Sequence, residues 1–296
     1  MKRESHIMLR LLAVIGFLAV CYQDLFAGEV RFSQTLPPVL PPKARIYKFK
    51  APDVTIKGLS SIAKALGLNS ISGKYDEQQK FISYVEGDYI VIQWKASGAI
   101  NFKNTKRYYK EDSGAPSINL PDDQAIDITR NFIISKGLVN EHELFLEKVS
   151  HRRMVAVDKQ MTQRIEKTVE TIVIFGRKIN NVSVDGPGGK ILVYVGTDGG
   201  IIGLKKVWRE IDREIGRVNV VNRDKALSNI VGRLSVFPKA EILKARFCYF
   251  EKGEEDAQTY LEPAYVFVYS AGNENFPEKS VDILPASDKI FEGFTR

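Results

Sequence analysis

The sequence predicts an α+β protein built from repeated helix-on-antiparallel-sheet units that follow an N-terminal signal segment. The chain of 296 residues is 44% hydrophobic and 27% charged, which is typical of globular proteins. Helix-spaced apolar residues occur in three stretches, and alternating apolar segments with glycine-rich turns follow each of them. These observations favour helices that each pack on a small sheet.

Residues 1–27 have the parts of an export signal. Lys2, Arg3 and Arg10 are basic, and the uninterrupted apolar segment 11–20 follows them. As a helix this segment measures about 15 Å, roughly half the hydrocarbon thickness of a bilayer. We therefore expect a signal peptide or membrane anchor, and a mature body in the periplasm, in the cell envelope or secreted.

Three processing outcomes remain open for this segment. Cleavage after Ala27 leaves a small residue at the cut. Cys21 ends a stretch that resembles a lipoprotein lipobox, although Val20 replaces the usual small residue. An uncleaved anchor is the third outcome. If Cys21 is removed or lipidated, Cys248 stands alone, and its apolar surroundings predict a buried structural thiol.

The formal net charge of +7 comes from scattered basic residues without a dense run. This pattern indicates a solvated surface, and we expect no nucleic-acid partner. We expect membrane contact only through the N-terminal segment, if that segment stays uncleaved or is lipidated.

Residues 28–53 are predicted to be a Pro-rich linker. The stretch contains two Pro-Pro pairs and Pro52. Proline fixes φ and restricts the residue before it, so the segment is expected to be extended and non-helical.

The first α+β unit is expected at 54–118. Apolar residues at helical spacing predict a helix over 56–66, and Gly67 is expected to end it. Strands are expected at 81–86 and 89–94, joined by a hairpin turn.

The second unit is expected at 119–215. Asp122 and Asp123 lie where the first turn of a helix favours acids, and Lys136-Gly137 is expected to end that helix. The strands expected after it are 144–149, 169–177, 191–195 and 201–208.

The third unit is expected at 216–296, with a helix that begins after Asn222. Its expected strands are 240–250, 260–270 and 280–284. Sequence identity between the units is low, so a single mixed α+β domain without repeats is the alternative to three units.

The second and third units resemble the PepSY domain of peptidase propeptides and exported regulatory proteins. The segments that carry the resemblance are Asp123–Ile128, Gly137-Leu138, Gly199–Ile202, Asp224–Leu227, Leu261–Phe267 and Ile283–Ala286. The resemblance implies a small sheet packed on a helix that works by binding, in proteins associated with peptidase inhibition or with sensing outside the membrane. It supplies no catalytic residues.

Motifs for catalysis or metal binding are weak. His142 and His151 are nine residues apart, and this spacing does not bring two ligands to one side of a helix. The segment 186–190 superficially resembles a phosphate loop, but a strand follows it, so a tight turn is expected. We predict no catalytic residue, no cofactor and no metal site.

Two further segments have a structural and a functional interpretation. The acidic stretch 251–256 is expected to be a solvated hairpin tip. Trp208 is expected in the core or at its rim, with stacking on a sugar or peptide as the alternative.

A partner-binding face is predicted on the strand over 260–270. Its alternation places Tyr265, Phe267 and Tyr269 on one side, and aromatic residues are favoured interface anchors. We expect this side to be partly open. The alternative is that these aromatics belong to the core.

Together these observations predict an exported, non-catalytic binding or regulatory protein of the cell envelope. The expected partner is a protein or peptide of the envelope, such as a peptidase or a sensor that the chain inhibits or binds. An envelope carbohydrate- or peptide-acting hydrolase with unidentified carboxylates is the alternative, and a structural envelope component is a third.

Overall fold

A computed structural model of the chain describes residues 29–37, 39–68, 73–108, 120–157, 164–273 and 276–292. It divides the chain into two compact units. Of the described residues, those within 29–44, 217–247 and 263–292 belong to unit 1, and those within 45–216 and 248–262 belong to unit 2.

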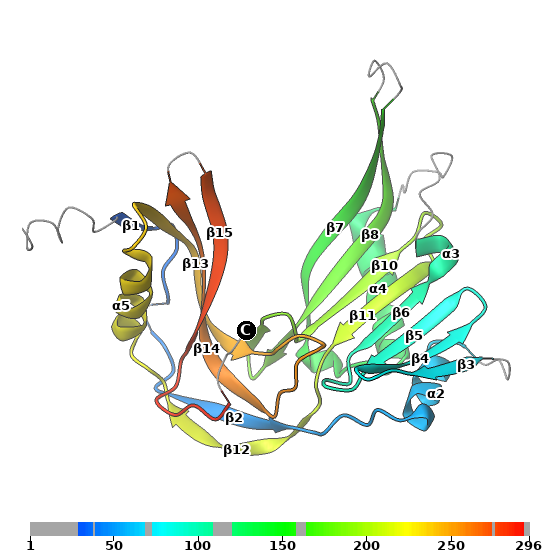
Figure 1. Ribbon diagram of the computed structural model, residues 1–296, viewed down its shortest axis with the longest axis horizontal. Coiled ribbons are helices and arrows are strands. Elements are labelled where there is room, and N and C mark those ends of the chain that lie inside the picture. Colours follow the sequence, from blue (N-terminus) through cyan, green and yellow to red (C-terminus); the bar gives the residue numbers. More distant parts are fainter. Residues whose placement is uncertain are drawn as a thin grey trace, which may run out of the picture. The chain divides into compact units, whose positions relative to one another are not determined.

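Unit 2 is built on an antiparallel sheet, whose strands follow the order β9-β8-β10-β11-β6-β5-β4-β3. A further strand, β7, pairs with β8, and the two continue as a ribbon beyond the neighbouring strands (Figure 1). The strands are β3 Lys74–Glu77, β4 Phe81–Glu86, β5 Tyr89–Trp94, β6 Ile100–Asn104, β7 Leu144–Val157, β8 Arg164–Ile179, β9 Val182–Asp185, β10 Lys190–Val195 and β11 Ile201–Val207.

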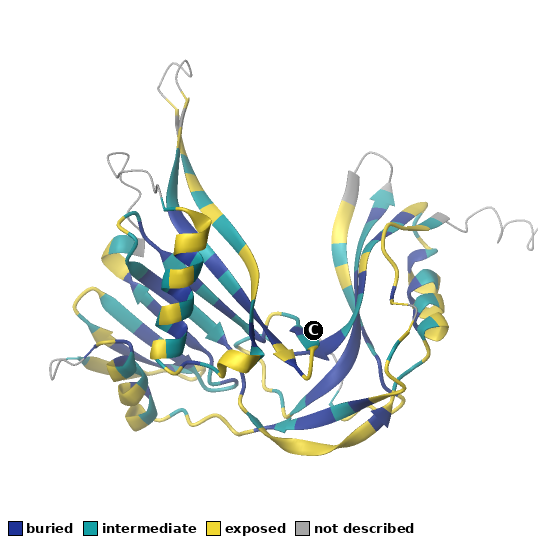
Figure 2. Ribbon diagram, turned by 180° about the vertical axis from the view of Figure 1, so that it is seen from behind, coloured by how far each residue is buried: buried dark blue, intermediate teal, exposed yellow. Residues whose placement is uncertain are grey.

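Helices α2 (Ile56–Ala65) and α4 (Asp122–Ser135) lie on the same face of this sheet (Figures 1 and 2). Each helix contributes to one hydrophobic core with the inward-facing residues of the strands. Two short elements, α3 (Thr105–Tyr108) and the 3-10 helix η1 (Glu141–Glu143), complete the helical part of unit 2 in the described residues.

Local signals explain where α2 and α4 begin and end. The Thr55 hydroxyl accepts a hydrogen bond from the Gly58 amide at 3.0 Å and caps the first turn of α2. Asp122 and Asp123 lie in the first turn of α4, where a negative charge complements the helix dipole. Gly137, at φ +60°, follows the last turn of α4 in the left-handed conformation that favours glycine.

Unit 1 packs helix α5 (Arg223–Leu234) on strands β13 (Lys239–Phe250) and β14 (Tyr260–Asn273). Strand β1 (Glu29–Phe32) pairs in parallel with β13, and β15 (Phe276–Pro285) pairs in antiparallel with β14. The boundary between the units falls within β13, β14, β2 (Lys43–Phe49) and β12 (Ile211–Asn219).

The predicted fold class of repeated helix-on-antiparallel-sheet units is wrong. The described residues form a large mixed sheet of fifteen strands, and 52% of these residues are in strands and 18% in helices. Strand β11 of the expected second unit pairs with β6 of the expected first unit, from Gly203 with Lys103 to Lys206 with Ile100. The described residues of 54–118 and of 119–215 therefore share one sheet and one core.

Residues 28–53, expected as a Pro-rich linker, contain β1 and β2. The export segment 1–27, with Cys21 and Ala27, lies outside the described residues. No helix in the described part of the chain is long and apolar enough to cross a membrane.

The shared core predicts that α2 and α4 unfold together. Leu59→Ala removes a fully buried α2 side chain, and we expect a loss of about 2–5 kcal/mol in the free energy of unfolding. Hydrogen exchange of the full chain should then show faster exchange at α4 amides as well as at α2 amides. The control Ile56→Ala changes a side chain of α2 that is 50% exposed, and it should leave α4 protected. Faster exchange confined to residues 54–118 would contradict a shared core.

Candidate functional site

A cavity of about 540 Å³ lies in unit 2, bordered by α2 and by the segment that follows α4. Its floor is the helix-covered face of the sheet at one row of paired residues. Gln93 of β5 pairs with Ile100 of β6, and Ile100 pairs with Lys206 of β11, so these side chains share a face. The size is within the range of small-molecule sites in proteins.

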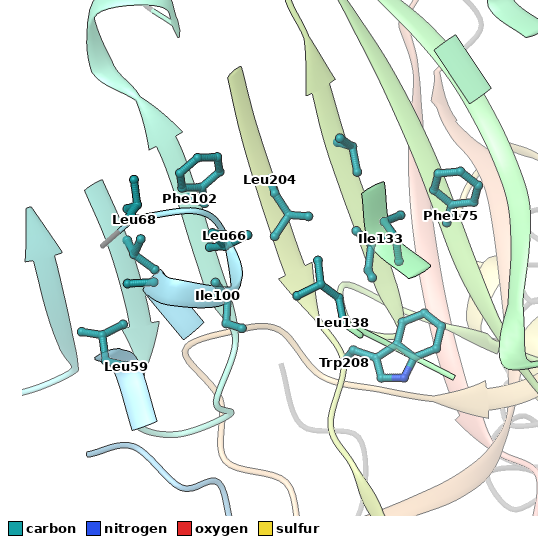
Figure 3. Packing of buried hydrophobic residues seen from close by; sticks show 14 of the residues in the cluster. Leu59, Leu66, Leu68, Ile100, Phe102, Ile133, Leu138, Phe175, Leu204 and Trp208 are labelled. Carbon is teal, nitrogen blue, oxygen red and sulfur yellow. The ribbon is translucent and has the colours of Figure 1, made fainter. Parts of the chain in front are cut away.

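The cavity wall combines apolar and charged residues. Ile62, Leu138 and Trp208 supply apolar surface, and Figure 3 shows the Trp208 indole at the lower edge of the hydrophobic core. The small residues Gly58 and Ala65 of α2 also line the cavity. The charged residues of the lining are Lys50, Asp53, Lys136, Lys206, Arg209 and Glu210.

Gln93 is a buried polar residue in this lining, with 5% of its surface exposed. Its Nε2 donates a hydrogen bond to the Asp53 carbonyl oxygen at 3.2 Å. This bond determines the orientation of the side-chain amide, because only the nitrogen can donate. Its Oε1 has no hydrogen-bond partner in the structure. A buried acceptor without a donor costs free energy that a ligand donor can recover.

Lys206 places its side chain in the same cavity. Burial lowers the pKa of this amine, Glu210 and Glu251 oppose the shift, and Arg177 adds to it. No carboxylate of the described residues forms an ion pair with Lys206, whereas the exposed Lys50 pairs with Glu210 at 3.1 Å. Lys206 thus presents an ammonium whose charge is poorly compensated.

Trp208 is held against the cavity by Arg177. The Arg177 guanidinium carbon lies 5.0 Å from the centre of the indole ring, within range of a cation–π contact. Arg177 Nε donates to Glu143 Oε2 at 2.6 Å, and its Nη1 donates to the Arg209 carbonyl oxygen at 2.7 Å. These bonds fix the guanidinium and thereby the indole.

A buried ion pair fixes the next residue, Arg209. Glu251 is completely buried, and its Oε1 accepts from the Arg209 amide at 2.9 Å and from Arg209 Nη1 at 3.3 Å. Arg209 also donates to the carbonyl oxygens of Lys252, Gly253 and Asp256 at 2.8, 2.8 and 2.6 Å. The guanidinium therefore binds the 251–256 loop and is occupied within the protein.

Two charges oppose the cost of burying the Glu251 carboxylate. Burial raises the pKa of Glu251, while Arg177 and Arg209 act to lower it. Arg177 Nη1 lies 3.6 Å from Glu251 Oε2, so one carboxylate serves both guanidinium groups.

The segment 186–189 packs against this carboxylate and connects β9 to β10 as a tight turn. A Cβ atom at Gly186, where φ is +109°, would lie 2.5 Å from the Glu251 carbonyl oxygen. At Gly188 it would lie 2.4 Å from the Lys252 carbonyl oxygen. Glycine is needed here for close backbone approach, which agrees with the expected turn and not with a phosphate loop.

The predicted partner-binding face is not open. Tyr265 and Phe267 are fully buried, and they pack with Ile230 of α5 in the core of unit 1. Tyr269 is half-buried at the edge of the same core. The Tyr265 hydroxyl donates to the Val221 carbonyl oxygen at 2.5 Å, so even the polar end of this side chain is used internally. The expectation of a partly open side is therefore wrong for Tyr265 and Phe267, which belong to the core as the alternative held.

The expected solvated tip at 251–256 is only partly correct. Glu255 and Asp256 are exposed, but Glu251 is buried. His142 and His151 are both exposed, on η1 and β7, and no group of metal-ligating side chains occurs in the described residues. Cys248 is fully buried, as predicted.

Sequence reasoning missed Gln93, Lys206 and Glu251. Period-two alternation contained a signal for two of them, because Gln93 follows the inward-facing Val91 and Lys206 follows the inward-facing Leu204 by two positions. No local signal distinguishes Glu251 from its acidic neighbours.

The comparisons support the fold alone. No family model matches the chain, and no curated protein matches it in sequence. The chain is similar to a crystal structure of an uncharacterized protein from Eubacterium rectale, with 10% sequence identity and a TM-score of 0.56. The similarity covers 90% of this chain and 91% of that one. The PepSY resemblance thus stays a prediction from the residues.

The buried pair predicts a large effect of Glu251→Gln. The substitution leaves Arg209 buried without a carboxylate and removes one of the two carboxylates beside Arg177, which keeps Glu143. We therefore expect a loss of about 3–5 kcal/mol in the free energy of unfolding. Urea unfolding measures it. The control Glu255→Gln removes an exposed carboxylate paired with Lys80, and a much smaller loss is expected, because both side chains of this pair are exposed. Equal losses in the two variants would contradict the role of Glu251.

The lowered pKa of Lys206 predicts that Lys206→Met is more stable than the native chain at neutral pH. Folding disfavours the charged amine, so the unfolded state binds the proton more tightly. Native stability should therefore rise as the pH increases from the lowered folded pKa toward the unfolded value of about 10.4. The variant should lack this rise. Thermal unfolding against pH tests both points, with exposed Lys57→Met as the control that keeps the rise.

Proposed function

We propose that this chain is an exported, non-catalytic binding protein of the cell envelope, and that the cavity in unit 2 holds part of a peptide partner. The observation that carries the proposal is the pair of unsatisfied polar groups on the cavity floor. Gln93 Oε1 lacks a donor, and the Lys206 amine lacks a paired carboxylate. A ligand with complementary polarity is stabilised by its interactions with both groups.

The framework around the cavity suits binding without large rearrangement. Trp208 and Arg209 are held by internal hydrogen bonds and by a cation–π contact, so the wall is ordered before a ligand arrives. Preorganised walls lower the entropic cost of association. The N-terminal pattern of residues 1–27 supports an extracytoplasmic location, where envelope peptides are available.

Thermal shift on the purified full chain tests this function. The probes are acetylated dipeptides, as free acids and as C-terminal amides, and N-acetylglucosamine oligomers. At a ligand concentration of 100 times Kd, binding adds about 2.7 kcal/mol of stability, which a melting curve detects. We expect at least one dipeptide to raise the melting temperature, and mass spectrometry should find it unhydrolysed.

Two matched variants place the binding in the cavity. Ala65→Phe adds bulk to the lining and should abolish the shift. Lys64→Phe adds the same ring at an exposed position of α2 outside the lining, and should retain it. A shift with oligosaccharides only, a hydrolysed peptide, or no shift with any dipeptide would overturn the proposal.

A further inference from the structure

The cavity floor places a cation and a hydrogen-bond acceptor on adjacent positions of one sheet face. Gln93 and Lys206 both flank Ile100, so their Cα atoms are two strand spacings apart, about 9.6 Å. The flexible four-carbon stem of lysine allows its amine to approach the Gln93 amide. A ligand that carries an anion next to an N–H donor is complementary to this pair.

We infer that the cavity recognises the carboxyl-terminal residue of a peptide, with Lys206 pairing to the α-carboxylate and Gln93 Oε1 accepting from the last peptide N–H. This inference rests on the proposed function and names its ligand class. In a terminal residue the peptide nitrogen and the carboxylate carbon are separated only by Cα, about 2.5 Å from each other. One residue therefore supplies both groups.

The charges of the cavity favour a singly charged anion. The Arg209 guanidinium is neutralised by Glu251 and occupied by three carbonyl oxygens, and Lys50 is paired with Glu210. Asp53 offsets one of the two remaining lysines, Lys136 and Lys206. Of these two, Lys206 is the one on the sheet floor, whereas Lys136 follows the last turn of α4. A carboxylate matches this single positive charge.

The apolar wall accommodates the side chain of that terminal residue. Ile62 of α2, Leu138 after α4 and the Trp208 indole face the same cavity as the polar pair. Aromatic and aliphatic side chains gain from burial against such surface. We therefore choose phenylalanine as the terminal residue of the probe.

Isothermal titration calorimetry of the full chain tests the inference with acetyl-alanyl-phenylalanine and its C-terminal amide. We expect the acid to bind at least tenfold more tightly than the amide, since the amide cannot form the ion pair with Lys206. Lys206→Met should remove this difference. The control Lys205→Met changes the neighbouring lysine, which points to the opposite face of β11 and pairs with Glu254, and should keep it.

Gln93→Leu tests the second contact. This substitution should weaken binding of the acid at least tenfold. It should also weaken binding of the amide, because both ligands contain the peptide N–H. Free phenylalanine, which has an ammonium in place of the peptide bond, distinguishes the two sources of an α-carboxylate. We expect it to bind at least tenfold less tightly than the acetylated dipeptide, and tighter binding of the free amino acid would overturn the assignment to a peptide end.

The pH dependence has a defined sign. The ion pair requires protonated Lys206, so affinity for the acid should fall, by up to tenfold per pH unit, as the pH rises above the lowered pKa of the free site. The charged groups around this amine are Glu210, Glu251 and Arg177, with Lys50, Asp53 and Lys136 in the same lining. The amide and the Lys206→Met variant should show no such fall.

The outcomes separate this inference from the proposed function. Equal affinity for acid and amide, or an unchanged ratio in Lys206→Met, overturns carboxylate recognition while binding in the cavity stands. Failure of both the acid and the amide to bind, together with the absence of any dipeptide shift, overturns the proposed function itself.

Discussion

The buried carboxylate of Glu251 organises the end of the sheet on which the candidate site of unit 2 depends. It receives the Arg209 amide and guanidinium, and Arg177 lies within ion-pair distance. Arg177 in turn packs on the indole of Trp208. A buried charge is tolerated only when its partners are fixed, so this cluster requires one backbone path for 208–209 and 251–256. The ion pairs of Glu251 therefore determine the positions of Trp208 and Arg209 in the cavity wall.

The cavity itself works against stability. A well-packed core has few empty volumes and no unsatisfied polar groups, yet Gln93 and Lys206 occupy inward positions of the sheet. Helix α2 places the small residue Ala65 in the lining, where a larger side chain would fill the space. Such departures from optimal packing are typical of binding and catalytic sites, where a ligand replaces the missing contacts.

Local sequence signals predicted the elements but not their assembly. Strands β4 and β5 begin and end at the predicted residues, and α2 and α4 lie where helical spacing and caps placed them. The pairing of β6 with β11 joins segments about a hundred residues apart, and no local pattern encodes that choice. The same limit explains the aromatic strand, because alternation shows two faces but does not show that α5 covers the side with Tyr265 and Phe267.

The candidate site could not be predicted from the sequence because it also depends on contacts between distant residues. Glu251 belongs to the same acidic stretch as the exposed Glu255, and its partners Arg177 and Arg209 are distant in the sequence. Charged residues are usually assigned to the protein surface, since burying an isolated charge costs free energy. In this chain the cost is offset by residues on β8 and just after β11. An acidic residue directly after an apolar strand can therefore be buried. Its sequence neighbours do not decide this, because its arginine partner can lie anywhere in the chain.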